Sequence, residues 1–467
     1  MTLARFESYI ARTGMDRKQY QFDGVKWCFD NETRADPPCG VRGGFVADEM
    51  GLGKTIMMIG LMLSNFVQRT LIVVPPVLIE QWADKIYETT GHLPLVFYGD
   101  AKKDITIDDL NSATIVIVSY SAISLTKAQF RAQELTLLHK VSWGRIIFDE
   151  AHHLRNRSTT RYIGAKLLSA GIRWLVSGTP IQNRKQDFYS LCAMIRLPAS
   201  FYMENSNLRA LARAFILKRT KAQVGIKLPD LDVNSDVVKW KNHKEMTLAE
   251  DIHTALALSQ NKGGGNATLT LMLRAKQSCI YPALLHKSAD VLMELGIIED
   301  EEEFEQAFEH SSKLDYAVAC ILKRRGNGRG KLIFCHYHDE IDEVARRLRK
   351  GGMTTVTTFD GRTGAAQRAA ILNGDNEAIV LQIQTGCEGL NLQEHYSEIF
   401  FISPHWNPAV EDQAIARCHR IGQTKPVYVQ RFEMSKFTED KSVSLDKYVN
   451  SVQERKRIIA NECLTEE

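Results

Sequence analysis

The sequence has no long hydrophobic run. No stretch of about 18 uninterrupted apolar residues occurs in it, so no membrane-spanning helix is expected. Its first residues also lack the apolar core of a secretion signal, because Arg5, Glu7, Arg12 and Asp16 interrupt them. The apolar fraction of 44% is nevertheless enough for sizeable cores, and a length of 467 residues predicts roughly two to four domains.

A strong charge of one sign is absent as well. The formal net charge of +3 does not indicate a chain-wide surface for polyanions, so any nucleic-acid site must be a local basic groove. The nine cysteines show no C-x-x-C or other zinc-binding spacing, and their number is odd. This pattern favours free thiols in a reducing intracellular compartment.

One stretch carries a phosphate-binding pattern. The apolar residues 45–47 lead into a turn that contains Gly51 and Gly53 and ends in Lys54 and Thr55, ahead of an apolar helical run. Glycines let several backbone N–H groups point at one anion, and the start of a helix adds partial positive charge. Lys54 adds a full charge and Thr55 offers a hydroxyl to Mg²⁺.

The loop departs from the general pattern G-x-x-x-x-G-K-[ST]. That pattern would place glycine at position 48, where this chain has Asp48. The form found here, A-x-x-x-G-x-G-K-T, is a variant typical of helicase-like ATPases. The alternative is a glycine loop that only turns the chain, but a strand before it and a helix after it favour phosphate binding.

Further apolar segments predict two parallel sheets. They are rich in β-branched residues, alternate with helical or polar material, and indicate strands that are buried on both faces. The ligand site of such a sheet lies at the carboxyl ends of its strands. The first group is 71–76, 113–120, 145–148 and 173–180; the second group is 331–335, 354–359, 378–383, 398–402 and 427–432, and it has no phosphate loop of its own.

Two adjacent carboxylates, Asp149 and Glu150, directly follow the segment 145–148. Asp149 can hold Mg²⁺ through water, and Glu150 can orient or deprotonate an attacking water. The four letters Asp-Glu-Ala-His are a weak signal alone, and acidic residues in a helical first turn are the alternative. Their position after a strand is what indicates a role in phosphate chemistry.

A pair of arginines lies in the second group of segments. Arg417 and Arg420 are three residues apart, so they share a face if the segment is helical. Two such arginines can reach a γ-phosphate and stabilise the charge of a transition state. An arginine pair of this spacing is usually exposed surface, and only the other motifs favour a catalytic role.

The motifs divide the chain into five segments. We expect an N-terminal segment with an adenine-contact motif (1–40), a first ATP-binding lobe (41–195), helical insertions with an inter-lobe connector (196–310), a second lobe (311–436) and a helical tail (437–467). The acidic run 299–305 is expected to be solvated surface, and an autoinhibitory contact is the alternative.

Together these motifs resemble helicase superfamily 2 and, more narrowly, the SWI/SNF-related family of DNA-dependent ATPases. The resemblance covers roughly residues 17–435 in the expected order. It implies an α/β fold of two RecA-like lobes, with parallel sheets covered by helices and with helical insertions between the lobes. The stretches that carry it are 48–55, 177–183, 216–221 followed by Leu228 and Pro229, 386–392, 402–408 and 412–423.

The resemblance also implies roles for single residues. Gln21 resembles the residue that reads adenine, Glu150 would act on the hydrolytic water, and Arg417 and Arg420 look like arginine fingers. Ser177 stands where threonine is frequent, and Cys387 where glycine is. The implied nucleotide-binding residues are Asp48, Met50, Gly51, Leu52, Gly53, Lys54, Thr55 and Gly389, with Thr55 and Asp149 for Mg²⁺ and with His152, Ser177 and Thr179 for coupling to lobe movement.

The function implied by the resemblance is ATP-dependent translocation on double-stranded DNA, with remodelling or displacement of protein–DNA complexes. DNA phosphates would be touched by 119–120, 361–363 and 385–391. Nucleosomes, the transcription machinery and a targeting subunit are further expected partners. The protein would be intracellular, in the nucleus or, if a virus encodes it, in the host cell or virion. Two alternatives stay open: a strand-separating DNA or RNA helicase, and a scaffold that binds DNA or protein without hydrolysis.

Overall fold

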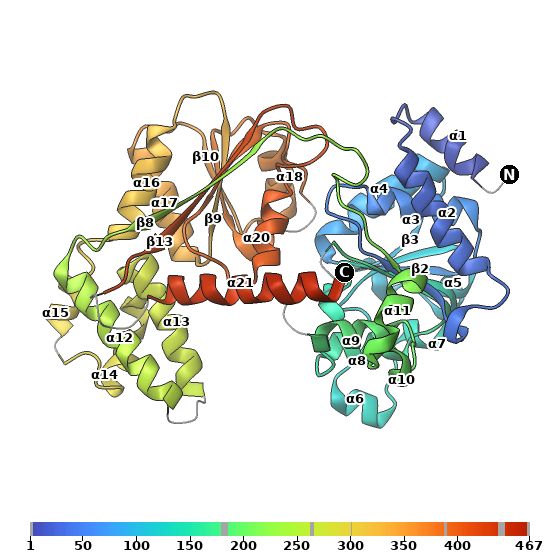
Figure 1. Ribbon diagram of the computed structural model, residues 1–467, viewed down its shortest axis with the longest axis horizontal. Coiled ribbons are helices and arrows are strands. Elements are labelled where there is room, and N and C mark those ends of the chain that lie inside the picture. Colours follow the sequence, from blue (N-terminus) through green and yellow to red (C-terminus); the bar gives the residue numbers. More distant parts are fainter. Residues whose placement is uncertain are drawn as a thin grey trace. The chain divides into compact units, whose positions relative to one another are not determined.

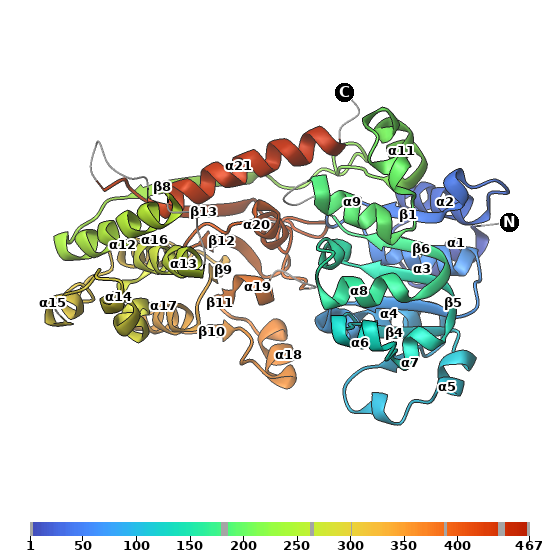
Figure 2. The ribbon, with the colours of Figure 1, turned by 90° about the horizontal axis from the view of Figure 1, so that it is seen from below.

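The computed structural model describes residues 3–178, 185–261, 266–299, 301–386, 390–437 and 444–464. The chain forms two compact units, one made of residues 1–227 with 458–467 and the other of residues 228–457. Each unit is built on one parallel β-sheet with helices packed against it (Figures 1 and 2). This arrangement confirms the predicted α/β fold class.

The first unit contains a seven-stranded sheet in which all pairs are parallel. Every residue of its inner strands β2 and β4 is buried, as the continuous β-branched runs predict for a sheet covered on both faces. Its order is β3 (Leu95–Phe97), β4 (Ile115–Ser119), β2 (Thr70–Val74), β5 (Ser142–Asp149), β6 (Ser169–Val176), β1 (Arg42–Val46) and β7 (Ile216–Leu217).

Alternate residues of these strands belong to two different hydrophobic cores. Ile72 and Val74 of β2 pack in a core with α1 (Ala4–Arg12), α2 (Gln19–Thr33), α3 (Lys54–Ser64) and α4 (Ile79–Thr90). Leu71 and Val73 pack in the opposite core. Its helices are α5 (Ile107–Ser112), α7 (Leu137–Lys140), α8 (Thr160–Leu167), α9 (Lys185–Met194), α10 (Ala199–Tyr202) and α11 (Leu208–Phe215), while α6 (Lys127–Ala132) lies outside both cores.

The second unit contains a six-stranded sheet, again with every pair parallel. Its order is β10 (Val356–Phe359), β11 (Ala378–Gln382), β9 (Gly330–Cys335), β12 (Tyr396–Phe401), β13 (Val427–Met434) and β8 (Leu231–Val238).

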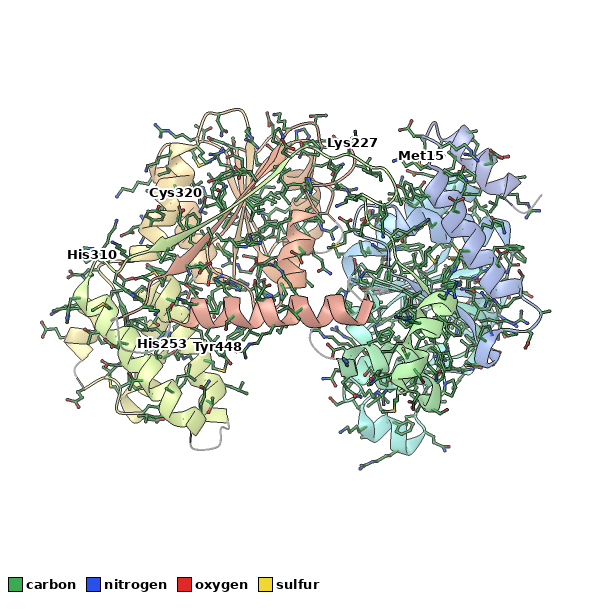
Figure 3. The ribbon with its side chains drawn as sticks, in the orientation of Figure 1. Met15, Lys227, His253, His310, Cys320 and Tyr448 are labelled. Atoms are coloured by element: carbon green, nitrogen blue, oxygen red, sulfur yellow. The ribbon has the colours of Figure 1, made fainter. Side chains whose placement is uncertain are left out.

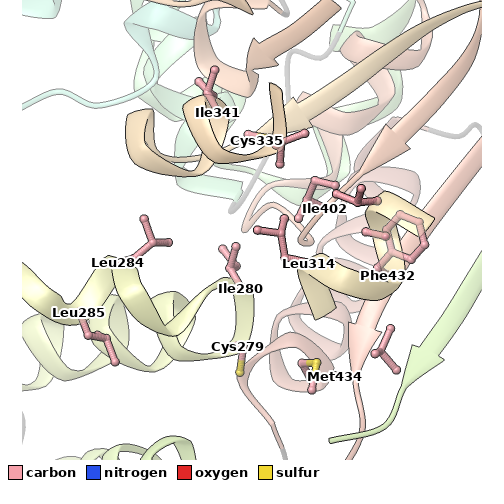
Figure 4. Close-up of a cluster of buried hydrophobic side chains, with 14 of the residues drawn as sticks. Cys279, Ile280, Leu284, Leu285, Leu314, Cys335, Ile341, Ile402, Phe432 and Met434 are labelled. Atoms are coloured by element: carbon pink, nitrogen blue, oxygen red, sulfur yellow. The ribbon is translucent and has the colours of Figure 1, made fainter. Parts of the chain in front are cut away.

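The larger core of this unit joins the sheet to helices on one face. Figure 4 shows Ile280, Leu314 and Ile402 converging in it, and all three are fully shielded from solvent. The helices that contribute to this core are α12 (His243–Asn261), α13 (Asn266–Ile280), α14 (Ala289–Glu294), α15 (Glu301–Gln306), α16 (Ser312–Lys323), α17 (His338–Lys350) and the start of α21 (Leu445–Leu464). The smaller core includes α18 (Ala365–Asn373), α19 (Ile383–Gly386) and α20 (Pro408–Ile415).

The segment 196–310 contains two strands that the sequence pattern does not predict. The two-residue β7 pairs with β1, and the eight-residue β8 pairs with β13. The division between the units falls after Lys227, which Figure 3 labels, so residues 196–227 pack with the first sheet and 228–310 with the second. The expected insertions are therefore parts of the two sheet units.

Each unit holds a fully buried ion pair. In the first unit the Arg145 guanidinium donates to both carboxylate oxygens of Glu32, at 2.7 and 2.5 Å. In the second unit the Lys313 ammonium lies 2.5 Å from a carboxylate oxygen of Asp446. No helix among the described residues has both the length and the apolar character needed to span a membrane.

Candidate functional site

The phosphate loop connects β1, which ends at Val46, to α3, which begins at Lys54. Gly51 and Gly53 have φ of 92° and 80°, in the left-handed region that favours glycine. A Cβ on Gly53 would also lie 2.5 Å from the amide nitrogen of Gln21. The loop therefore needs these glycines both for its backbone path and for the close approach of Gln21.

Gln21, the predicted adenine-contact residue, is buried at the start of α2. Its side-chain amide donates a hydrogen bond to the Leu52 carbonyl, 3.3 Å away. The N-terminal segment thus touches the phosphate loop directly, and the structure brings these two predicted parts of the site together.

Lys54 is held over the loop from its first helical position. Its ammonium donates to the Asp48 carbonyl at 2.9 Å. A Cβ on Gly178, which follows β6, would lie 3.3 Å from the same ammonium and 2.7 Å from Cγ of Met50. Ser177 donates its backbone N–H to the Val46 carbonyl at 3.1 Å. The end of β6 therefore lies against the phosphate loop.

The Asp48 side chain is paired with Arg219, a residue of the stretch 216–221. Both of its carboxylate oxygens accept hydrogen bonds from Arg219, at 3.1 and 2.5 Å, and the side chain is fully buried. The next residue, Glu49, pairs with the Lys221 ammonium at 2.8 Å. A nucleotide contact by Asp48 stays a prediction, and it would have to use the backbone.

Asp149 is the last residue of β5. One carboxylate oxygen accepts from the Trp82 indole at 2.8 Å, and the other from the Glu150 backbone N–H at 3.0 Å. Burial, followed by the negative charge of Glu150, raises the pKa of Asp149 to about 6, while Trp82 and the Lys54 ammonium oppose that rise. Only β6 separates β5 from β1 in the sheet, so Asp149 at the end of β5 and the phosphate loop after β1 lie at the same carboxyl edge.

Glu150 occupies a backbone conformation that is unusual for its residue type. Its φ of 50° and ψ of 48° are left-handed, which costs a non-glycine residue about 1 kcal/mol or more. One of its carboxylate oxygens lies 3.3 Å from Nδ1 of His152, whose ring is 4.6 Å from that of His153. This backbone conformation sets the direction in which the Glu150 side chain projects after the end of β5.

The residues predicted for Mg²⁺ supply the donor type that this ion prefers. Thr55 offers a hydroxyl oxygen from the first turn of α3, and Asp149 offers a buried carboxylate whose burial a cation would offset. Among the described residues, no group of three or more His, Cys, Asp or Glu side chains could hold a metal by itself. This donor set fits a cation whose shell is completed by water and substrate phosphates.

The second unit carries the predicted arginine pair. Arg417 is buried and donates to the carbonyls of Gln413 and Leu390, at 3.3 and 3.4 Å. Arg420 donates to the side-chain oxygen of Asn391. Burial, and then the charge of Arg417, lower the pKa of Arg420 to about 10. Two neighbouring cations bonded to neutral acceptors form a local positive charge that would favour an anion.

The segment that holds these arginines is not helical, so the condition under which they would share a helical face is not met. Helix α20 stops at Ile415, and residues 416–422 form successive tight turns, with Arg417 N–H donating to Ala414 and Gln423 N–H to Arg420. Gly422, at φ 95°, allows the chain to reverse there. The arginines are thus held by turns and by carbonyls from 390–391 rather than by one helical face.

The segments predicted to touch DNA follow strands at the carboxyl edges of the sheets. Tyr120 is buried and donates its hydroxyl to the Asp149 carbonyl at 2.7 Å, and the Ser119 hydroxyl lies 2.8 Å from that of Ser121. Arg362 forms ion pairs with Asp342 and Asp360, at 2.8 and 2.6 Å. The predicted positions Thr179, Cys387 and Gly389 lie outside the described residues.

Trp82 and Arg219 were not predicted as part of the site, and Tyr120 was predicted only as a DNA contact. Trp82 bonds to the Asp149 carboxylate, Tyr120 supports the same residue from its backbone, and Arg219 bonds to Asp48. Trp82 lies on an amphipathic helix where a core role is the ordinary expectation. Arg219 stands in the connector stretch 216–221, whose position in the motif order was the available signal.

The model of an SNF2-related domain matches residues 20–284, which is more than half of the chain. The chain belongs to the SNF2-related family. A model of the helicase conserved C-terminal domain matches residues 312–422. This SNF2-related chain therefore combines the two domains of a helicase-like, DNA-dependent ATPase, which uses ATP, and the predicted resemblance to SWI/SNF-type proteins of helicase superfamily 2 is confirmed.

Individual proteins are similar to this chain over most of its length. A probable global transactivator of Orgyia pseudotsugata multicapsid polyhedrosis virus is 30% identical, over 95% of this chain and 90% of its own. DNA repair protein RAD5B of Arabidopsis thaliana is 25% identical over 91% of this chain, which spans only 46% of RAD5B. Among solved structures, the Sulfolobus solfataricus SWI2/SNF2 ATPase core in complex with dsDNA matches over 96% of both chains, at 22% identity and a TM-score of 0.40.

Proposed function

We propose that this SNF2-related chain is an ATP-dependent translocase on double-stranded DNA. It hydrolyses ATP in a cleft between its two sheet units, moves along the duplex, and remodels or displaces protein–DNA complexes. The observation that carries the proposal is the arrangement at the carboxyl edge of the first sheet, where the phosphate loop with Lys54 follows β1 and Asp149 and Glu150 stand at the end of β5, with β6 between the two strands.

The nucleotide-binding step follows from the contacts of the loop. Its glycine-dependent backbone and the Lys54 ammonium bind the phosphates, and Gln21, held against Leu52, contacts the adenine. Thr55 and Asp149 are the residues that would hold Mg²⁺, which when bound neutralises part of the charge on the transferring phosphate.

Glu150 supplies the proton acceptor for hydrolysis. It follows Asp149 on a strained turn and takes the proton from the attacking water. Arg417 and Arg420, which donate hydrogen bonds to neutral oxygens of Gln413, Leu390 and Asn391, stabilise the transition state when the units close on the nucleotide. Closure and reopening of the cleft move the two units along the DNA.

The expected DNA contacts are compatible with this cycle. Residues 119–120, 361–363 and 385 follow β4, β10 and β11, and Tyr120 connects its segment to Asp149 through one hydrogen bond. Contacts to DNA phosphates carry little sequence information and weaken as salt rises. Nucleosomes, the transcription machinery and a targeting subunit belong to this proposal as partners.

The test is the ATPase rate of the full chain with no nucleic acid, single-stranded DNA, duplex DNA, RNA and nucleosomes. Duplex DNA should stimulate hydrolysis most, and displacement of a third strand from a triplex should report movement along the duplex. The Glu150→Gln variant provides the blank for both assays.

Two results would replace the proposal by its alternatives. Robust separation of duplex strands would favour a helicase. Absence of nucleic-acid-stimulated hydrolysis, with Glu150→Gln equal to the wild type, would favour a scaffold that binds without hydrolysis.

A further inference from the structure

Arg219 lies outside the phosphate loop in sequence, yet it contacts the loop, helix α2 and helix α3. It donates from Nε and Nη2 to the two carboxylate oxygens of Asp48, at 3.1 and 2.5 Å. Its Nη1 donates to the Tyr20 carbonyl, and its Nη2 lies 3.4 Å from the sulfur of Met57 on α3. One side chain thus joins the adenine segment, the loop and the helix that follows the loop.

The surroundings are shaped to admit this guanidinium. A Cβ on Gly24 of α2 would lie 2.8 Å from Nη2 of Arg219 and 2.7 Å from the Met57 sulfur, so glycine leaves the space that the arginine uses. The guanidinium carbon also lies 5.6 Å from the centre of the Tyr20 ring. Asp48 is fully buried and Arg219 is 17% exposed, so the pair is screened little by solvent.

The backbone of the connector continues the same attachment. Ala47 N–H donates to Leu217 at 2.7 Å, and Glu49 N–H to Arg219 at 2.9 Å. The Lys221 backbone N–H and ammonium both reach Glu49, at 2.8 Å each. The loop residues 47–49 are therefore paired with 217–221 along their length, with the Arg219–Asp48 pair at the centre.

We propose that Arg219 is a positioning residue for nucleotide binding. By holding the Asp48 carboxylate and the Tyr20 carbonyl, it fixes the phosphate loop relative to Gln21, so that one nucleotide meets the phosphate site and the adenine site together. Asp48, the position where the general pattern has glycine, is then a requirement of this attachment. The inference rests on the proposed function, because it concerns how the same loop binds ATP.

Arg219→Lys tests the inference, since lysine keeps the charge but cannot form the two-pronged contact. In the full chain the Kd for ATP should rise about tenfold or more, the scale of one hydrogen bond to a charged group. The preference for ATP over GTP should fall as well, because Tyr20 and Gln21 lose their anchor. The rate at saturating ATP should change less than the Kd does.

The chain offers a matched control in Arg145→Lys. Arg145 forms the same two-pronged contact to a buried carboxylate in the same unit, but the residues to which it donates hydrogen bonds, Glu32, Thr70 and Asn65, lie outside the phosphate loop. This variant should lower the melting temperature without changing the ATP Kd. An Arg219→Lys Kd within about twofold of the wild type, with a similar loss of melting temperature, would overturn the inference.

A double-mutant cycle makes the result independent of folding effects. Asp48→Asn should raise the Kd in the same direction, and the double variant should be no weaker than the weaker single variant, because both remove one contact. Additive effects would overturn the inference. Failure of the wild type to bind ATP would instead refute the proposed function itself, and the two failures are therefore distinguishable.

Discussion

The two sheets place six of their strands in the same order, but the predicted phosphate loop and the adjacent carboxylates follow strands of the first sheet. In the first, β1 lies beside β6, and in the second, β8 lies at the corresponding place beside β13. β1 leads into the phosphate loop, whereas β8 is followed by Lys239 and Trp240 without a glycine turn. β5 ends in Asp149 and is followed by Glu150, whereas the corresponding β12 is followed by Ile402 and Ser403.

This difference shows which parts of the chemistry come from the fold. Strand order alone places an edge at which ligands can bind, and the residues that follow two particular strands decide whether a nucleotide is bound there. The second sheet retains the scaffold and contributes the Arg417–Arg420 turns from the chain that follows β12. The predictions below test this division between the units.

The largest effect is expected from Glu150→Gln, which removes the proton acceptor while keeping the shape. Hydrolysis in a single-turnover assay should fall by about 10²–10⁴-fold, and ATP should still bind. Ser403→Ala, at the corresponding end of the second sheet, should leave the rate unchanged. Equal losses of activity in both variants would contradict the assignment of hydrolysis to the first sheet.

The next effect concerns the second unit. Arg417→Lys and Arg420→Lys should each lower kcat by about 10²-fold or more with little change in the Kd for ATP, because the guanidinium fork acts on the transition state. The measurement is steady-state ATPase at saturating duplex DNA. Arg346→Lys, on the exposed face of α17, is the matched control. A normal kcat in both variants would confine the chemistry to the first unit.

A third prediction concerns the stability of the second unit. Lys313→Met leaves the buried Asp446 carboxylate without its cation, which should cost about 3–5 kcal/mol in the free energy of unfolding. Denaturant unfolding followed by circular dichroism measures it. Arg346→Met, which breaks an exposed ion pair with Glu343, should leave unfolding unchanged. A Lys313→Met chain as stable as the wild type would contradict the importance of this pair.

The smallest effect is a shift in pH dependence. Asp149, with its pKa raised to about 6, gains a proton below that pH, so hydrolysis should decline as the pH falls through about 6. Trp82→Phe removes a hydrogen bond to the charged form and should move the decline upward by about one pH unit. The profile to measure is that of kcat/KM, which reports the enzyme before ATP binds, and an unmoved acid limb in it would exclude Asp149 as the cause.

Unfolding does not explain such a decline. A carboxyl whose folded pKa lies above the ordinary 3.8 favours the folded state at low pH, and that contribution is lost as the pH rises through about 6. The melting temperature of the chain should therefore not fall because of Asp149 in the range where activity is lost, and a melting series over the same pH values checks this.

The sequence was sufficient where one strong local rule decided the structure. Continuous β-branched runs predicted the buried strands, and the glycine turn before Lys54 predicted the loop. It was insufficient for β8, where Asp232, Asn234 and Asp236 disfavour a strand and pairing along the whole of β13 holds it at the sheet edge. Tertiary pairing there outweighs local preference.

The site residues divide in the same way. Lys54, Asp149 and Glu150 stand in motifs whose spacing carries the chemistry. Trp82 and Arg219 reach the site through contacts between residues 67 and 171 positions apart, which no local pattern encodes. The turns around Arg417 depend on oxygens of Leu390 and Asn391 and on Gly422, none of which the three-residue spacing of the arginines encodes.

Because β7 and β8 pair with different sheets, the chain between them limits the distance between their ends. Residues 218–230 are the only chain between Leu217, the last residue of β7, and Leu231, the first residue of β8. Fully extended, a stretch of this length spans roughly 45 Å. The connector therefore sets an upper limit on the distance between these two strand ends. Inserting residues into it would raise that limit without altering either sheet.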